Sequence, residues 1–140
     1  MNASLMLAIG LALIASMTGC AGHDRSPVTG RVGIELGGSG YVRLERHPDG
    51  SAVATVLEAP PSGETYVRFE FSEHPNFRML KTENGYPFVL RFDAQMCISE
   101  RGVCAETNVI PIAPNGGSFE SWTDPIDQLI FSNFRLTPPD

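Results

Sequence analysis

The strongest constraint on the fold of this 140-residue chain is a repeated alternation of apolar and polar residues. The segment ETYVRFEF places Val67, Phe69 and Phe71 on one side of a two-residue period and its charged residues on the other. The segment PFVLRFDAQMC, residues 87–97, repeats this alternation. Because successive side chains of a β-strand point to opposite faces of a sheet, both segments are predicted to be strands with one buried face.

Nine segments of this kind follow one another, and turn-forming sequences rich in Gly, Pro and Asn separate most of them. The predicted strands span residues 31–36, 41–46, 51–59, 64–71, 77–82, 87–97, 107–112, 118–122 and 128–136. Short strands with turns every eight to twelve residues or so are typical of all-β domains. The sequence therefore predicts an all-β fold, either an antiparallel sandwich or a small barrel.

Several local signals refine this prediction. The dipeptide Asn84-Gly85 is the strongest short-range hairpin signal in the chain, and residues 72–76 are predicted to form a loop. Pro111 lies inside a predicted strand, which indicates an edge position or a bulge. The segment SWTDPIDQL could form a single helical turn with Asp124 as its N-cap.

The first twenty residues, MNASLMLAIGLALIASMTGC, contain no charged side chain. Their apolar run has the length of a signal-peptide core and is short for a membrane-spanning helix. The final four residues, MTGC, resemble a bacterial lipobox, which implies that Cys20 is acylated and becomes the first residue of the mature chain. Ala21 after that cysteine implies export to the outer membrane. An ordinary secretory signal or a membrane anchor helix remains the alternative.

These observations divide the chain into a signal peptide (1–19), a lipidated tether (20–30) and a β-sandwich domain (31–140). Every charged residue follows Cys20, and the formal net charge is −6. Because no basic patch is present, the composition argues against a nucleic-acid partner. The membrane contact is therefore expected to depend on lipid, with the domain facing the periplasm.

With Cys20 assigned to lipid, Cys97 and Cys104 are the two cysteines that remain, and an oxidising periplasm favours a bond between them. The alternation puts Met96 on the core face and Cys97 on the opposite, polar face, so the bond is expected at an accessible hairpin end. Such a bond closes a loop that the chain-entropy estimate values at about 2.5 kcal/mol. A structural staple is the preferred interpretation, and a labile, exchanging disulfide is the alternative.

The stretch CISERGVCAETNVIPI resembles the cysteine hairpin of the periplasmic N-terminal domain of thiol:disulfide interchange reductases. The matching residues are Cys97, Cys104, Glu106, Thr107 and the run Ile110-Pro111-Ile112. The resemblance implies an immunoglobulin-like sandwich, and it implies that the two cysteines would be an exchanging pair. Six residues separate the cysteines here, where the family usually has five.

Other catalytic patterns are missing from the sequence. No histidines have the spacing of a metal site, and the set His74, Met79 and Met96 is better explained by core packing of Met96. No nucleophile elbow and no phosphate-binding loop occur.

The candidates for a partner surface are three aromatic residues, Trp122, Tyr66 and Tyr86, although Trp122 could also pack partly into the core. We therefore expect a non-catalytic binding or assembly module that contacts another cell-envelope protein. Apart from the covalent lipid on Cys20, no cofactor is expected.

Overall fold

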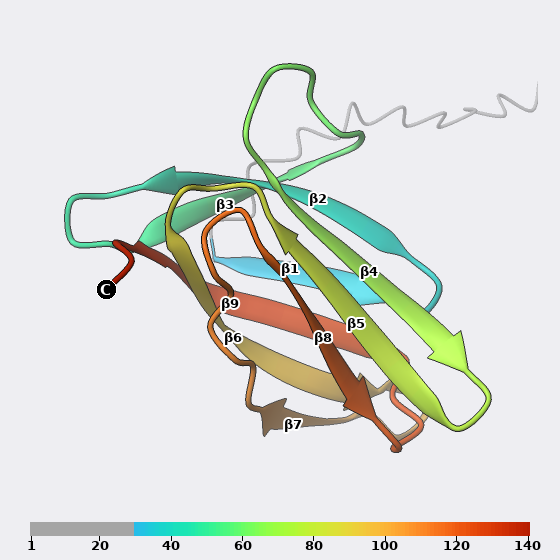
Figure 1. Ribbon diagram of the computed structural model, residues 1–140. Coiled ribbons are helices and arrows are strands. Elements are labelled where there is room, and N and C mark those ends of the chain that lie inside the picture. The colour runs from blue at the N-terminus through green and yellow to red at the C-terminus, as the bar shows by residue number, and fades with distance from the viewer. Residues whose placement is uncertain (1–29) are drawn as a thin grey trace, which may run out of the picture.

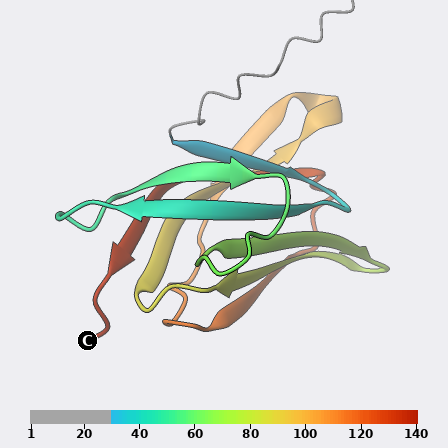
Figure 2. The same cartoon turned by 90° about the horizontal axis from the view of Figure 1, so that it is seen from above.

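The structure, a computed structural model, describes residues 30–140. Two antiparallel sheets face each other as a sandwich, so the predicted β-sandwich is confirmed (Figures 1 and 2). One sheet has the strand order β1 (Arg31–Glu35), β9 (Gln128–Thr137), β6 (Val89–Ile98), β7 (Val103–Thr107). The other has the order β3 (Ala52–Leu57), β2 (Ser39–Arg46), β4 (Val67–His74), β5 (Phe77–Asn84), β8 (Gly117–Trp122).

The core lies between the two sheets, and it contains a cluster of phenylalanine rings among aliphatic side chains. Phe69 of β4 stacks on Phe131 of β9 with ring centroids 4.5 Å apart, which joins one sheet to the other. Phe92 of β6 meets both rings edge-on, at 5.5 Å from Phe69 and 5.1 Å from Phe131. These residues occupy the apolar positions of the two-residue period, so the alternation in the sequence does set the buried face.

A β-bulge in β9 keeps the buried face in phase. The register between β6 and β9 shifts beside Phe92, where Asn133 and Phe134 together oppose a single residue. Asn133 has a φ of 52°, in the left-handed region that asparagine tolerates better than most residues. Because of this extra residue, Phe131 and Phe134 both point into the core although three positions separate them.

The hairpin predicted at Asn84-Gly85 is wrong, because β5 and β6 belong to different sheets. The Asn84 side chain is buried, and its amide donates to the carbonyl oxygens of Phe88 (2.8 Å) and Ala113 (3.1 Å). A Cβ atom at Gly85 would lie 2.6 Å from the carbonyl oxygen of Tyr66. The chain therefore crosses from one sheet to the other at this dipeptide. Position 85 must be glycine because the backbone of Tyr66 leaves no room for a side chain.

Three further local predictions are also wrong. Strand β4 continues to His74, so the turn after it is shorter than the predicted loop at residues 72–76. The strand near Pro111 ends earlier, at Thr107, and beyond it Ile112 forms an isolated bridge with Leu90. Within residues 30–140 the helical turn lies at Ser99–Arg101, not in the segment SWTDPIDQL.

The predicted signal peptide and most of the predicted tether lie outside the described residues. Within the described range, no helix is both long enough and apolar enough to cross a membrane.

Two hydroxyl groups interrupt the apolar core. Thr82 of β5 and Ser118 of β8 are directly opposite each other on the inner face of their sheet. Both side chains are buried, and neither hydroxyl has a hydrogen-bond partner among the described residues. A buried hydroxyl without a partner loses its hydration without compensation, which lowers the stability of the fold.

Replacing Thr82 by valine should therefore stabilise the protein. The substitution keeps the branched shape and removes the uncompensated hydroxyl, so we expect Thr82→Val to raise the free energy of unfolding by about 1 kcal/mol. Urea unfolding measures the change. Thr55→Val, on the outer face of β3, is the matched control and should have little effect; a loss of stability in Thr82→Val would contradict this account.

Candidate functional site

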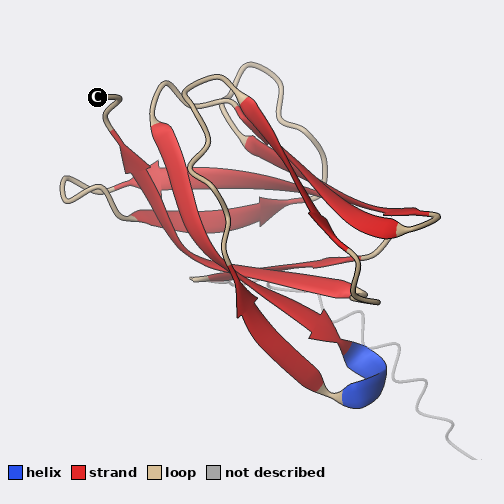
Figure 3. Ribbon diagram, turned by 60° about the horizontal axis from the view of Figure 1, so that its bottom comes forward, coloured by secondary structure: helices blue, strands red, loops and turns tan. Residues whose placement is uncertain are grey.

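The two cysteines join neighbouring strands at the end of a hairpin. Cys97 of β6 and Cys104 of β7 are directly opposed in the antiparallel register, with Cα atoms 4.1 Å apart, and they form a disulfide. The connecting turn contains the short helix Ser99–Arg101 and ends at Gly102, whose φ is 61°. This hairpin projects from the sandwich, with its helical turn at the tip (Figure 3).

Cys97 is less accessible than the sequence suggested. Met96 packs against the core and Cys97 lies on the other face, as the alternation predicts. However, Cys97 is only 2% exposed, so the disulfide predicted to be accessible is shielded at Cys97. Strand β6 lies between β7 and β9, and Cys104 and Gln128 flank Cys97 from the two sides. Cys104 is exposed because β7 is the edge strand, so the disulfide can be approached from that side.

A carboxylate fixes the turn beside the disulfide. Asp127 accepts hydrogen bonds from the backbone N–H and the hydroxyl group of Ser99, both at 2.9 Å. These bonds, the backbone one first, hold the pKa of Asp127 below its ordinary value. The backbone N–H of Asp127 in turn donates to the carbonyl oxygen of Cys97 at 3.0 Å. The segment before β9 is thus tied to both the turn and the first cysteine, which favours a rigid hairpin.

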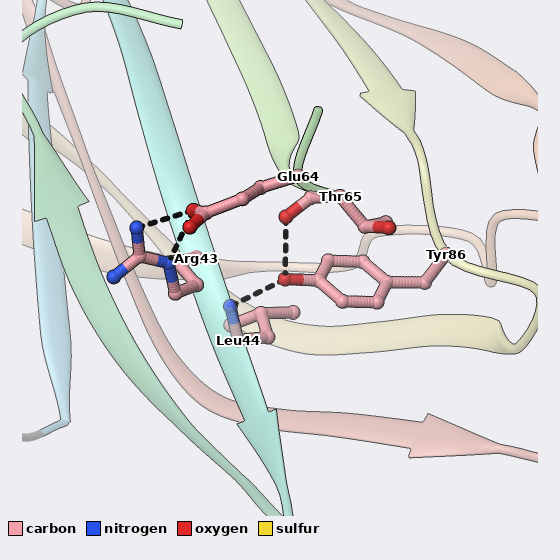
Figure 4. Close-up of polar contacts among 5 residues, drawn as sticks. All are labelled: Arg43, Leu44, Glu64, Thr65 and Tyr86. Atoms are coloured by element: carbon pink, nitrogen blue, oxygen red, sulfur yellow. Dashed lines mark hydrogen bonds and ion pairs between the residues drawn. The ribbon is translucent and has the colours of Figure 1, made fainter. Parts of the chain in front are cut away.

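Tyr86 fills a gap in the five-stranded sheet (Figure 4). Its hydroxyl accepts a hydrogen bond from the backbone N–H of Leu44 at 2.7 Å and donates to the carbonyl oxygen of Thr65 at 3.1 Å. The pairing of β2 with β4 ends at Val67, so the tyrosine connects the segments that continue from these two strands just beyond their last paired residues. Its ring packs against the core, and burial raises the pKa of Tyr86. The hydroxyl of Tyr86 therefore has a structural role, in which it bridges the backbone of Leu44 and Thr65.

Trp122 also has a structural position. Its ring packs against the core from β8, and its indole N–H donates to the hydroxyl of Thr107 at 3.0 Å. Two positions earlier on the same face, the carboxylate of Glu120 accepts from the backbone N–H of Ile110 at 3.1 Å. Together these bonds attach the segment that follows β7 to the inner side of β8.

Tyr66 borders an open hollow on the outer face of the five-stranded sheet. Its ring meets Tyr41 edge-on, with centroids 5.9 Å apart. The hollow measures about 570 Å³ and continues over the backbone of Gly85, Gly116 and Gly117. A Cβ atom at Gly117 would lie 3.0 Å from the carbonyl oxygen of Thr82, so the backbone is closely packed at this point.

The charged residues around the hollow neutralise one another. Glu83 lies 2.9 Å from the ammonium of Lys81 and 3.5 Å from the guanidinium of Arg68. The hydrogen bond from Lys81, followed by the charges of both cations, holds the pKa of Glu83 below its ordinary value. Arg43 and Glu64 form a further ion pair at the rim (Figure 4). The hollow therefore offers little net charge and is better suited to a neutral group than to an ion.

Phe119 is the residue at this site that sequence reasoning missed. It lies on β8 next to the hollow and is 64% exposed, more than any other large apolar residue in the described range. In the segment SFESW, Phe119 and Trp122 are three positions apart, so a regular strand can turn only one of them to the core. That spacing was a usable signal that one aromatic side chain faces solvent.

Comparisons with known proteins identify no relative. No protein-family model, curated protein or solved structure matches this chain. Within residues 30–140, no three His, Cys, Asp or Glu side chains lie close enough together to hold a metal ion.

Replacing Tyr86 by phenylalanine should destabilise the fold. The half-buried N–H of Leu44 would lose its acceptor, at a cost of about 1–3 kcal/mol at neutral pH. Because burial raises the pKa of Tyr86, the folded protein holds the phenolic proton more tightly than the unfolded chain does. Wild-type stability should therefore fall as the pH rises through the ordinary tyrosine pKa of about 10, and Tyr86→Phe should lack this part of the fall.

Urea unfolding from neutral to alkaline pH measures both effects. Tyr66→Phe, at the neighbouring half-buried tyrosine, is the matched control and should cost less. Equal costs in the two variants would contradict the bridging role of the Tyr86 hydroxyl.

Proposed function

We propose that the chain is a lipid-anchored, non-catalytic binding or assembly module of the bacterial cell envelope. In this proposal the signal segment is removed before Cys20, and the acylated Cys20 anchors the domain to the periplasmic side of the outer membrane. The observation that carries the proposal is the pairing of Cys97 with Cys104, which leaves Cys20 as the third cysteine of the chain. Cys20 is also the cysteine that follows the lipobox-like residues Met17-Thr18-Gly19.

The surroundings of the disulfide support a structural role. Cys97 is buried on a central strand, and Asp127 ties the adjoining turn in place through Ser99. A reductant would have to approach from the side of Cys104. The alternative is a periplasmic thiol-disulfide exchange protein that uses Cys97 and Cys104, and the exposure of Cys104 is the observation that favours it.

The proposal extends to the class of sandwich, which we take to be immunoglobulin-like in architecture alone. Four and five strands in the two sheets equal the number found in variable-type immunoglobulin domains. The strand order differs, because the first two strands of an immunoglobulin domain are neighbours in one sheet, whereas β1 and β2 lie in different sheets. A shared architecture with a different connectivity does not bring a shared function.

Fatty-acid labelling tests the anchor. Cells that express the full chain should incorporate labelled palmitate into the wild-type protein, and Cys20→Ser should abolish the incorporation because serine offers no thiol. Cys104→Ser is the control for loss of a cysteine elsewhere and should still be labelled. Undiminished labelling of Cys20→Ser would contradict the proposal.

A further inference from the structure

Strand β8 presents an unpaired edge of the five-stranded sheet. It is the last strand in the order and pairs with β5 on one side, and the described chain places no strand on its other side. The backbone N–H of Asn84 donates to the carbonyl oxygen of Gly116 at 2.8 Å, which sets the phase of hydrogen bonding between β5 and β8. By the antiparallel alternation, the N–H and C=O groups of Gly117, Phe119 and Ser121 point outward.

The outward-facing positions of this edge carry neither a charged residue nor a proline, and the charged residue of the strand, Glu120, lies on the inner face, where it accepts the backbone N–H of Ile110. Natural edge strands carry charged residues or proline, or are covered by another segment. The three outward positions of β8 are glycine, phenylalanine and serine. At the opposite edge of this sheet, the chain at the start of β3 is bridged to β9 through Ser51 and Arg135. Of the two edges of the five-stranded sheet, β8 is therefore the one whose outward backbone groups are open to a further strand.

Apolar side chains flank the edge on both faces of the sheet. Phe119 is 64% exposed on the outer face, and Ile110 is 60% exposed on the inner side, where its backbone N–H is bonded to Glu120 of β8. These are the two most exposed large apolar residues in the described range. Apolar side chains beside an unpaired sheet edge suit the addition of a strand, in which main-chain hydrogen bonds supply affinity and side-chain contacts supply specificity.

We propose that β8 is a self-association site, at which two copies of this chain pair their β8 strands antiparallel about a two-fold axis and join their sheets. The same edge carries a projecting ring, Phe119, and a hollow with a glycine floor at Gly117. In a two-fold symmetric interface the same surface of both copies meets, so the Phe119 ring of each copy can lie against the hollow of the other. The hollow carries little net charge, which fits an aromatic ring as its occupant.

The side chains also agree with one register. Pairing centred on Phe119 places Gly117 opposite Ser121 and Ser118 opposite Glu120 of the second copy. No like charges lie directly opposite each other, although the two Glu120 side chains are diagonal neighbours on the inner face. Each Phe119 lies diagonal to the second copy's Gly117, within reach of an aromatic side chain.

Sedimentation of the full chain, purified in the form in which cells make it, tests the proposal. Wild-type protein should shift from monomer to dimer as its concentration rises. Phe119→Lys should weaken association at least about tenfold, by loss of the apolar contact and addition of like charges. Val103→Lys is the matched control, because Val103 is 54% exposed on β7, and it should dimerise as wild type does.

A second variant acts on the backbone. Ser121→Pro removes an outward-facing N–H and leaves the bonds to β5 in place, so it should also abolish the dimer, whereas Ser121→Ala should not. If Ser121→Pro fails to fold, the proposal is tested by comparing the dimerisation of Phe119→Lys with that of Val103→Lys. A wild-type protein that stays monomeric, or a dimer that survives Phe119→Lys, would overturn the proposal.

Photo-crosslinking in cells separates self-association from other partners. A benzophenone amino acid at position 121 should give an adduct that contains two differently tagged copies of the chain, and the same probe at position 103 should give none. An adduct of position 121 with a different protein, and none between copies, would overturn the choice of a second copy as the occupant.

Discussion

The contact between Phe69 and Phe131 connects the two sheets, and much of the structure depends on it. The rings stack between β4 and β9, and Phe92 of β6 meets both edge-on. The bulge at Asn133 then lets Phe134 join the same cluster, since a regular strand would direct it to solvent. This packing holds β6 as a central strand, and β6 in turn carries the hairpin with the disulfide.

The alternation of residues was sufficient to predict the sandwich and its buried faces, because burial on one face requires a two-residue period. The three-residue spacing of Phe131 and Phe134 breaks the two-residue period, which is the sequence sign of the bulge. A local pattern alone, however, cannot distinguish a bulge from the end of a strand. Asn84-Gly85 shows the limit of such patterns. Its function depends on Ala113 and Tyr66, which reach it through tertiary packing, so a local hairpin signal gave the wrong connection.

For the site residues as well, local features could be predicted from the sequence and features that depend on tertiary packing could not. The bond between Cys97 and Cys104 could be predicted by counting cysteines, and the face of Cys97 by counting residues. Its burial could not be predicted, because it follows from the position of β6 between two neighbouring strands. Tyr86 and Trp122 proved to be fixed by hydrogen bonds within the fold, whereas Phe119 is the aromatic residue that faces solvent. We therefore place the proposed binding surface at the edge of β8 around Phe119, beside the hollow that Tyr66 borders.

We propose that the Cys97–Cys104 disulfide staples the β6–β7 hairpin and does not exchange electrons. The most direct measurement is its reduction potential in the folded protein, obtained by equilibration in graded dithiothreitol buffers. A staple should have a potential below about −300 mV, and its reduction should lower the unfolding temperature. A potential between about −120 and −270 mV, the range of thiol-disulfide exchange proteins, with no loss of stability on reduction, would contradict the claim.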